Sequence, residues 1–496
     1  AKLLEASGVH INGDGSTGAE LNNNKIIGNY IGVLMSNTNG CTIGNYIKGN
    51  QNIILGNTLA GIKLSNSYDN QIKSNYIGID ANNTISLPNG NFGIYVTNGS
   101  YDNIIGQSYN NTAVGNVISG HSLAGIFIEA ANTHSNHIYS NKIGTDFTGT
   151  KSIPNTFGIA IYQSNSNLIG DNNTISGNNG AGILLNDAGK NLIVGNFIGT
   201  NGSGNKSLPN HTGVVLSGRS IQNKIGYSSI VLPVTTRNVI SGNSWDGVKF
   251  SGTAVVGNVL SGNYIGTDIT GLLAIPNNRN GIILSDGAPN NILGGWKKAE
   301  ENIISGNANA GIFIKGSNDN KIGGNLIGLD ALGHNRIPNM TGIYLEKATN
   351  NYIGGDPDIE LSPNVISGNN GDGIFLSSSD FNHLTTNIIG LNPNTILQIP
   401  NSKNGIQIVS SRNNIIGESS EIGNIIGGNG EDGVRIISGF NNSLYLNYIG
   451  TNQLLLNLPN RTGISLNSSG ENKISNNFIR NNCRGIEEIS NVSHNY

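Results

Sequence analysis

The sequence predicts an all-β fold in which short parallel strands stack as about 16 three-stranded coils. Three observations predict it. A Gly followed by alternating apolar residues recurs along the chain, most of the intervals are close to 31 residues, and the composition favours turns. The chain has 496 residues, of which 71 are Gly and 86 are Asn. Both residue types tolerate the positive φ that tight corners need. We therefore expect a single solenoid domain over residues 1–496.

The first strand of each coil begins at a Gly that precedes alternating apolar residues. The motif reads GIKL at Gly61, GIFI at Gly311, GIYL at Gly342 and GIFL at Gly373. Alternation over four residues is the periodicity of a strand and not of a helix. One such coil cannot bury its own apolar face, so it has to stack on its neighbours.

The second and third strands are clearest in the shortest copy, GISLNSSGENKISNNFIRNNCR from Gly463, which contains three alternating runs in 22 residues. The 31-residue copies carry about nine more residues, inserted alternately after the third strand and between the second and third strands. The third strand is therefore predicted to be the floor of a groove between two ridges of loops. One ridge repeatedly ends in an apolar residue followed by Pro and Asn, which indicates anchored loops.

The pattern resembles the repeat arrays of right-handed parallel β-helix proteins, which include secreted and surface proteins and pectate-lyase-like solenoids. The resemblance rests on NxISGN and IGTDxxGxxxxPN motifs, such as IGTDITGLLAIPN from Ile265, and covers essentially the whole chain. It implies a single right-handed parallel β-helix with alternating loop insertions, as part of a longer secreted protein or a fibre subunit. It also implies an extracellular or cell-surface location and often a polysaccharide partner. It transfers no catalytic residue, because enzymes, adhesins and spacers share this fold.

The charge and hydropathy of the chain exclude several classes of partner. Only 11% of the residues are charged, the net charge is −3 and the pI is near 6.3. These values argue against a nucleic-acid-binding surface. The sequence has no apolar run of the roughly 20 residues that a membrane-spanning helix needs, so we expect no membrane insertion.

The predicted groove floor offers a first set of candidate binding residues. Its bulky outward positions include Tyr76, Phe197, Tyr264 and Tyr448, and its only charged member is Lys142. Glycoside hydrolysis needs two carboxyl groups ~5–9.5 Å apart, and elimination from uronic acids needs a base. One lysine and no carboxylate suit neither reaction. The sequence therefore predicts no catalytic residue.

The outward face of the first strands offers a second set. Phe313, Tyr344 and Phe375 fall on three consecutive coils, with Lys315 and Glu346 on two of them. At the usual spacing of parallel strands, about 4.8 Å, these rings would form a ladder. Such a ladder could stack on sugar rings or on another solenoid, or it could stabilise its own sheet. Lys315 and Glu346 are interpreted as a surface ion pair.

The acidic residues of the sequence offer only one weak candidate for a metal site. Asp80, Asp146, Asp268 and Asp330 recur after the IG dipeptide, but Asn replaces them in other copies, so we interpret this column as structural turn residues. A weak candidate for Ca²⁺ is the group Asp356, Asp358 and Glu360 on the varied loops. Otherwise no metal and no cofactor is expected.

Two classes of function remain open from the sequence. The main prediction is an extracellular structural or adhesive protein, a rigid rod or fibre subunit that assembles by coil stacking. The alternative is a polysaccharide-binding module, or a polysaccharide lyase or glycoside hydrolase of the β-helix type. The sequence leaves open whether the chain is an enzyme and favours the view that it is not. The expected partners are copies of itself, end-to-end or lateral, and polysaccharide.

Overall fold

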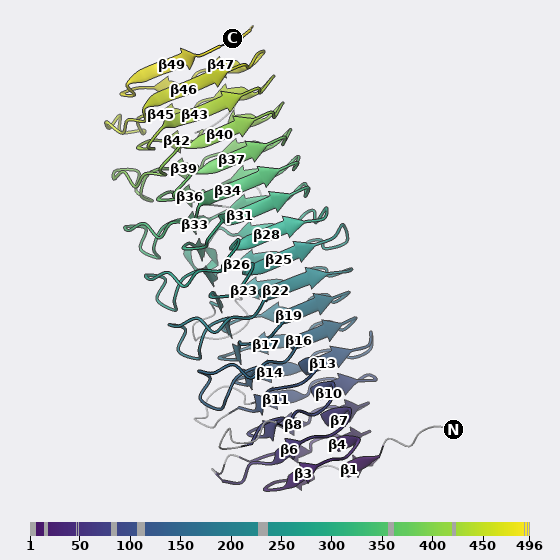
Figure 1. Ribbon diagram of the computed structural model, residues 1–496. Coiled ribbons are helices and arrows are strands. Elements are labelled where there is room, and N and C mark those ends of the chain that lie inside the picture. The colour runs from purple at the N-terminus through teal and green to yellow at the C-terminus, as the bar shows by residue number, and fades with distance from the viewer. Residues whose placement is uncertain are drawn as a thin grey trace. The chain divides into compact units, whose positions relative to one another are not determined.

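The computed structural model describes residues 6–13, 18–45, 47, 49–80, 87–106, 115–226, 237–355, 362–418, 423–490, 492, 493 and 495. The chain divides into two compact units, unit 1 (Ala1–Ser244) and unit 2 (Trp245–Tyr496). In each unit the chain runs through a strand of sheet 1, then of sheet 2, then of sheet 3, and begins the next coil (Figure 1). Corresponding strands of successive coils pair in parallel, for example β31 with β34. This is the predicted three-stranded solenoid.

The strands of unit 1 belong in turn to the three sheets. Sheet 1 contains β1 (Ser7–Asn12), β4 (Ile31–Ser36), β7 (Ala60–Ser65), β10 (Phe92–Thr97), β13 (Ala124–Glu129), β16 (Phe157–Tyr162), β19 (Ala181–Asn186) and β22 (Thr212–Ser217). Sheet 2 contains β2 (Glu20–Leu21), β5 (Thr42–Ile43), β8 (Gln71–Ile72), β11 (Ile104–Gly106), β14 (His137–Tyr139), β17 (Leu168–Gly170), β20 (Leu192–Ile193) and β23 (Lys224–Gly226). Sheet 3 contains β3 (Lys25–Ile27), β6 (Ile53–Leu55), β9 (Tyr76–Ile77), β12 (Val117–Ile118), β15 (Lys142–Ile143), β18 (Thr174–Ile175), β21 (Phe197–Ile198) and β24 (Val239–Ile240).

Unit 2 repeats the order and adds the short 3₁₀ helix η1 (Lys298–Glu300). Its sheet 1 contains β25 (Val248–Ser251), β28 (Ile282–Ser285), β31 (Ala310–Lys315), β34 (Thr341–Glu346), β37 (Ile374–Ser377), β40 (Ile406–Val409), β43 (Asp432–Ile437), β46 (Thr462–Asn467) and β49 (Arg484–Glu488). Sheet 2 contains β26 (Val259–Ser261), β29 (Ile292–Gly294), β32 (Lys321–Gly323), β35 (Tyr352–Gly354), β38 (His383–Thr385), β41 (Ile415–Gly417), β44 (Ser443–Tyr445) and β47 (Lys473–Ser475). Sheet 3 contains β27 (Tyr264–Ile265), β30 (Asn302–Ile304), β33 (Asn325–Ile327), β36 (Val365–Ile366), β39 (Ile388–Ile389), β42 (Ile425–Ile426), β45 (Tyr448–Ile449) and β48 (Phe478–Ile479).

The core of each unit consists of columns of Ile, Leu and Val that point into the coil. In unit 2, Ile312 pairs in register with Ile343 and Ile314 with Leu345, and all four side chains are fully buried. The Gly that opens the motif lies close against the next coil, as Gly311 of β31 does. A Cβ on Gly311 would lie 2.8 Å from the carbonyl oxygen of the next coil's Gly, so no larger residue fits there. The repeated Gly-apolar motif is thereby explained.

Ladders of Asn side chains line the corners. At the corner before sheet 3, the Nδ2 of Asn325 donates to Oδ1 of Asn364 at 2.9 Å, that of Asn364 to Asn387 at 3.0 Å, and that of Asn387 to Asn424 at 2.9 Å. The Nδ2 of Asn387 also donates to the carbonyl oxygen of Ile353 at 2.8 Å. Each rung therefore satisfies buried polar groups that would otherwise cost about 1–3 kcal/mol each.

The Asp and Asn residues after the IG dipeptide organise the loops that follow sheet 3. Oδ1 of Asp268 accepts hydrogen bonds from the backbone N–H groups of Leu272 and Leu273, both at 3.1 Å. Oδ1 of Asn392 accepts the equivalent two bonds, at 3.0 Å each, in a later copy. Because one carbonyl-type oxygen suffices, Asp and Asn are interchangeable there. The interpretation of this column as structural turn residues is confirmed.

The predicted groove over the third strands is closed over β30, β33 and β36 of unit 2, and the prediction was wrong there. The outward side chains of Ile303, Leu326 and Val365 are at most 5% exposed, because Leu329 and Ile399 from the loops pack on them. Each loop returns across the strand from which it starts, so its apolar residues cover that face. Among the described residues, no helix is long and apolar enough to cross a membrane.

Candidate functional site

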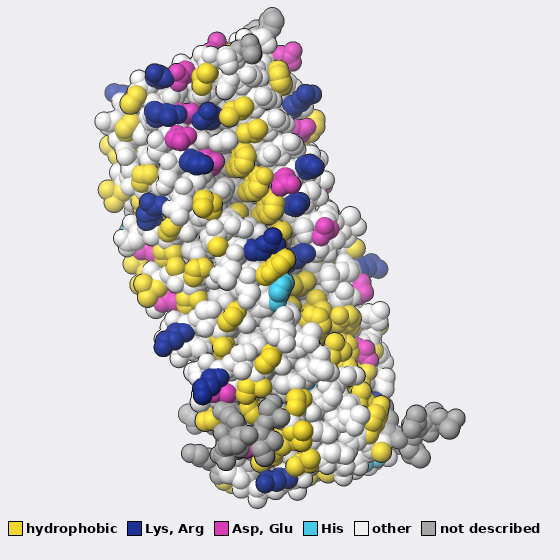
Figure 2. All heavy atoms as spheres, in the orientation of Figure 1, with side chains coloured by type: hydrophobic (Ala, Val, Ile, Leu, Met, Phe, Trp, Pro, Cys, Tyr) yellow, Lys and Arg dark blue, Asp and Glu magenta, His cyan; other side chains and the backbone are white. Residues whose placement is uncertain are grey.

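The outer face of sheet 1 in unit 2 carries the largest variety of side chains that a ligand could contact. In Figure 2, hydrophobic side chains form a band over these strands, with Lys and Arg side chains beside it. The six-residue strands of this face, such as β31 and β34, present outward a residue at the start, one near the middle and one at the end. Three consecutive middle positions are Phe313, Tyr344 and Phe375, which pair in register.

The three aromatic rings form the predicted ladder. The ring centroids of Phe313 and Tyr344 are 4.8 Å apart with an interplanar angle of 7°, and those of Tyr344 and Phe375 are 4.9 Å apart at 5°. The rings therefore cover much of one another's faces, and mainly their edges are left to contact solvent or a ligand. Burial raises the pKa of Tyr344, as does the charge of Glu346 to a lesser extent. The ladder thus stabilises its own sheet, and its role in binding stays a prediction.

The predicted ion pair is present at the end of the same strands. Nζ of Lys315 lies 4.0 Å from Oε1 of Glu346, and the lysine side chain is 57% exposed. On the other side of Lys315, the hydroxyls of Ser251 and Ser285 donate to Oδ2 of Asp286 at 2.5 and 2.9 Å. These two bonds lower the pKa of Asp286, and the charge of Lys315 contributes less. Lys315 is loosely held and accessible to a ligand.

A hollow of about 360 Å³ lies at the start of these strands, above Ala310. Ligand pockets in proteins begin at about 300 Å³. The hollow exists because the starts of β31 and β34 carry the small residues Ala310 and Thr341, and Asn280, which precedes β28 and accepts a hydrogen bond from Ala310, carries only a short amide side chain. Its lining consists of Arg279, Asn280, Ile283, Asn309, Ala310, Phe313, Lys315, Met340, Thr341 and Tyr344. Two cations and no carboxylate belong to this set, so the hollow attracts anions.

The rim of the hollow is formed by the corner residues that precede the strands. The backbone N–H of Asn309 donates to the carbonyl oxygen of Arg279 at 2.8 Å, and that of Met340 to Asn309 at 2.7 Å. The guanidinium of Arg279 lies 4.1 Å from the ring centroid of Trp245. A cation–π contact of this kind holds the guanidinium without using its N–H donors. Trp245 and Met340 are 44% and 53% exposed.

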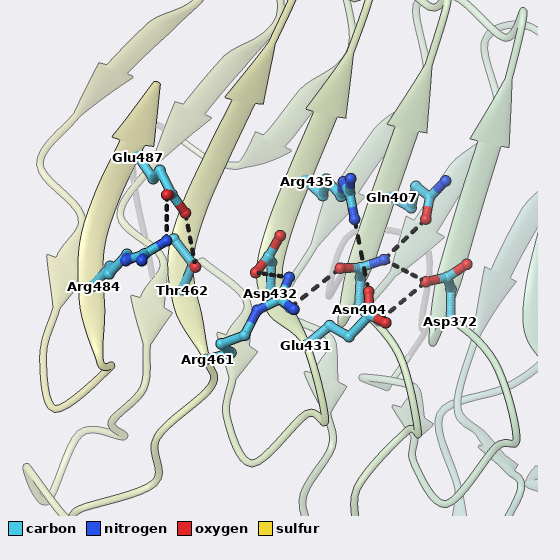
Figure 3. Close-up of polar contacts among 10 residues, drawn as sticks. All are labelled: Asp372, Asn404, Gln407, Glu431, Asp432, Arg435, Arg461, Thr462, Arg484 and Glu487. Carbon is cyan, nitrogen blue, oxygen red and sulfur yellow. Dashed lines mark hydrogen bonds and ion pairs between the residues drawn. The ribbon is translucent and has the colours of Figure 1, made fainter. Parts of the chain in front are cut away.

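Further along the same face the residues are polar and bond to one another (Figure 3). Oδ1 of Asp372 accepts from the backbone N–H and the Nδ2 of Asn404 at 3.0 and 2.8 Å, and Oδ1 of Asn404 accepts from the N–H of Asp432 at 3.1 Å. Nη2 of Arg461 lies 3.1 Å from Oδ1 of Asp432. Burial raises the pKa of Asp372. This row continues the strand ladder through side chains, so we do not assign it a ligand.

The four candidate residues on the third strands are separated from this face. Tyr76 is half-buried and burial raises its pKa, while Phe197 is buried. A Cβ on Gly271 would lie 2.7 Å from the ring of Tyr264, so a loop covers part of that ring. Tyr448 stacks on Phe478 at 5.1 Å. Loops and neighbouring rings thus occupy much of the surface on which a ligand was predicted to lie.

The sequence did not single out Arg279 and Met340, which line the hollow, or Trp245, whose ring contacts Arg279. A signal was available, because they occupy the second position before the recurring Gly (WDG, RNG and MTG). The candidate Ca²⁺ ligands Asp356, Asp358 and Glu360 lie outside the described residues. Within the residues that the structure does describe, no group of three His, Cys, Asp or Glu side chains could hold a metal ion.

Comparisons with known proteins support the fold. Residues 7–198 match the family model described as "Right handed beta helix region". No curated protein matches this sequence. Solved structures with similarity include the periplasmic alginate epimerase AlgG (14% identity over 84% of this chain and 77% of that chain, TM-score 0.33). Another is the A-module of mannuronan C-5 epimerase AlgE4 from Azotobacter vinelandii (12%, 94% and 90%, TM-score 0.31). A third is DFA-IIIase from Arthrobacter chlorophenolicus A6 (9%, 89% and 84%, TM-score 0.25).

With TM-scores of 0.25–0.33, these likenesses carry no argument about what the chain does. The family match, which lies within unit 1, agrees with the parallel three-stranded coils there, and unit 2 repeats the same coils. The resemblance to right-handed parallel β-helix proteins that the sequence predicted is therefore confirmed.

Proposed function

We propose that unit 2 binds an acidic polysaccharide on the outer face of sheet 1, with one sugar residue in the hollow above Ala310. The observation that carries this proposal is the lining of the hollow, which combines Arg279 and Lys315 with the rings of Phe313 and Tyr344. A sugar acid offers a carboxylate for the cations and C–H groups for the ring edges. Arg is well suited to the first contact, because its planar donors match a carboxylate.

The geometry also suits an extended chain better than a small isolated ligand. The hollow opens onto a sheet surface that continues along successive strands about 4.8 Å apart. Phe313, Tyr344 and Phe375 follow one another there, and the amide of the exposed Asn309 adds hydrogen-bonding groups at the rim. Neighbouring sugars could thus lie along the ladder while one carboxylate is held in the hollow.

Binding, and not cleavage, is the activity that these residues support. Glycoside hydrolysis needs a pair of carboxyl groups beside the bond that breaks. Beside the hollow, the carboxylate of Glu346 is paired with Lys315, and that of Asp246 accepts a hydrogen bond from Asn280. The role as a structural or adhesive rod, which the sequence favoured, does not account for cations and aromatic rings that line one hollow. The polysaccharide-binding alternative is therefore our preferred function, and an extracellular or cell-surface location is proposed with it. Recovery of the protein only from inside cells would contradict that location.

The test is a binding panel with matched variants. Polygalacturonate, alginate and hyaluronan represent acidic polysaccharides, and dextran and laminarin represent neutral ones. We expect an acidic polymer to bind, and R279Q/K315Q to weaken binding at least tenfold, since each charge-assisted hydrogen bond contributes about 1.5–3 kcal/mol. Affinity electrophoresis and calorimetry measure this. K321Q, which removes a lysine from sheet 2, is the control. Binding that is equal in wild type and R279Q/K315Q would refute the site.

A further inference from the structure

The loops that follow sheet 3 in unit 2 carry a row of exposed aliphatic side chains. The four loops span residues 268–275, 330–337, 392–399 and 452–458, and Figure 1 shows loops projecting beside the strands of this unit. Nine large aliphatic side chains are between 37% and 71% exposed: Ile269, Leu272, Leu273, Leu332, Ile396, Leu397, Leu454, Leu455 and Leu456. We call this set the aliphatic ridge.

The four loops touch one another in series, so the ridge is one surface. The backbone N–H of Ala331 donates to the carbonyl oxygen of Gly271 at 2.9 Å, which joins the first two loops. A Cβ on Gly333 would lie 2.5 Å from Pro393, which places the second loop against the third. Nδ2 of Asn452 donates to the carbonyl oxygen of Thr395 at 2.7 Å, which joins the third loop to the fourth.

The fold does not require these side chains to be apolar. The inner side of each loop already has its own anchor, since Ile275, Ile337, Ile399 and Leu458 are at most 9% exposed. Two loops of unit 1, 146–153 and 201–208, make the same turn with Asp146 and Asn201. Apart from Phe147, their exposed residues are Gly, Thr, Ser, Asn and Lys. The same turn therefore forms with a largely polar exterior.

We infer that the aliphatic ridge is the interface of a lateral homodimer, in which two copies of this chain pack ridge to ridge. Isolated exposed apolar residues are ordinary, but a continuous apolar patch of this size marks an interaction surface. The nine side chains together expose the equivalent of between four and five whole leucine residues. This is on the order of 800 Å², about what each partner contributes to a standard interface.

The composition of the ridge favours a second copy over other occupants. Among the described residues of these loops, the charged side chains are Asp268, Asp330 and Arg336. Asp268 and Asp330 accept hydrogen bonds within their own loops, and Nη2 of Arg336 donates to Asn370 at 2.8 Å. The ridge thus offers no charge to a charged partner, and two copies of it do not repel each other. It also lacks the Lys, Trp and Tyr residues that accompany apolar side chains at a lipid surface.

The experiment is sedimentation velocity of the full chain from 1 to 200 µM under reducing conditions. We expect a concentration-dependent dimer in wild type, and a monomer for L273Q/L332Q/L397Q/L454Q. These four side chains are exposed, so the variant should keep the wild-type circular dichroism and melting temperature. W296Q/F381Q, which removes two exposed apolar side chains outside the ridge, is the control and should stay dimeric.

A second readout locates the contact. In a C483S background, L332C places one exposed cysteine near the middle of the ridge, and oxidation should give a disulfide-linked dimer. F381C should give none. Wild type that is monomeric up to 200 µM would overturn the proposal, as would a dimer that survives in L273Q/L332Q/L397Q/L454Q. A monomer that floats with phosphatidylcholine vesicles through the ridge would also overturn it and assign the surface to lipid.

Discussion

The outer faces of sheet 1 in the two units have the same backbone arrangement, but different side chains occupy the first outward position of the strands. In unit 1 this position alternates between Ala and Phe, as in Ala60, Phe92 and Ala124. The rings of Phe92 and Phe127 stack at 4.7 Å and are only 7% and 9% exposed. In unit 2 the same position is Asn280, Ala310 and Thr341, and a hollow remains.

The difference teaches that a repeated fold can leave a hollow on its surface where a large side chain is missing. The aromatic residues of unit 1 close over one another, and Tyr95 donates to the carboxylate of Glu129, which occupies both groups. In unit 2 the ladder at Phe313 has no aromatic side chain at the strand start beside it. Arg279 and Lys315 therefore border an empty volume instead of a packed cluster.

The largest expected effect is a pH dependence of stability that arises at a corner ladder of unit 1 and has no counterpart at the equivalent ladder of unit 2. His121 occupies a position that is Asn in the flanking coils, its side chain is buried, and its Nδ1 lies 2.9 Å from the carbonyl oxygen of Asn89. Burial lowers the pKa of His121 from 6.5 to about 4. The unfolded chain therefore binds a proton between these pH values that the folded chain does not, so stability is complete above pH 6.5 and falls below it.

The loss of folding stability should reach about 3 kcal/mol at pH 4, because each unit by which the pKa is lowered corresponds to about 1.36 kcal/mol. Urea unfolding at pH 7.5 and pH 4.5 measures it. H121N restores the Asn rung and should remove this part of the pH dependence, while unit 2 has Asn339 and Asn369 at its equivalent positions. An unchanged pH profile in H121N would show that His121 does not set the acid sensitivity.

The next effect compares two alanines at the same strand position. A124F adds a ring to the packed cluster of unit 1 and should destabilise the protein by about 1–3 kcal/mol, since overpacking forces side chains out of their preferred rotamers. A310F places the ring in the hollow of unit 2 and should leave stability unchanged or slightly raised. Thermal unfolding of both variants measures the contrast. Equal destabilisation by the two would mean that the hollow is not a usable volume.

The smallest effect concerns the ion pair beside the ladder. E346Q removes the carboxylate 4.0 Å from Lys315. Because both side chains are partly exposed, stability should change by less than about 1 kcal/mol. Lys315 becomes more available, so the affinity for an acidic polysaccharide should rise about two- to fivefold. Calorimetry in low salt measures this rise, and weaker binding in E346Q would show that Glu346 itself contacts the ligand.

Particular residues show what the sequence could and could not predict. The Gly311 motif and the Asn325 ladder recur in nearly every coil, so periodicity alone predicted the coils, the corners and the aromatic ladder. The open groove was predicted wrongly, because nothing in the pattern showed that loop residues such as Leu329 would turn inward over Leu326. The hollow was not predicted, because it depends on a small residue, Ala310, and on the placement of Arg279 against Trp245.

The most direct test of the central claim is the affinity of A310F for the acidic polysaccharide that wild type binds best in the panel. The phenyl ring would fill the hollow without changing a charge or removing any lining group. We predict that A310F folds as wild type does and loses at least tenfold in affinity, while V215F, at a half-buried outward position of sheet 1 in unit 1, binds as wild type. Wild-type affinity in a folded A310F would contradict the claim that the hollow above Ala310 receives the sugar.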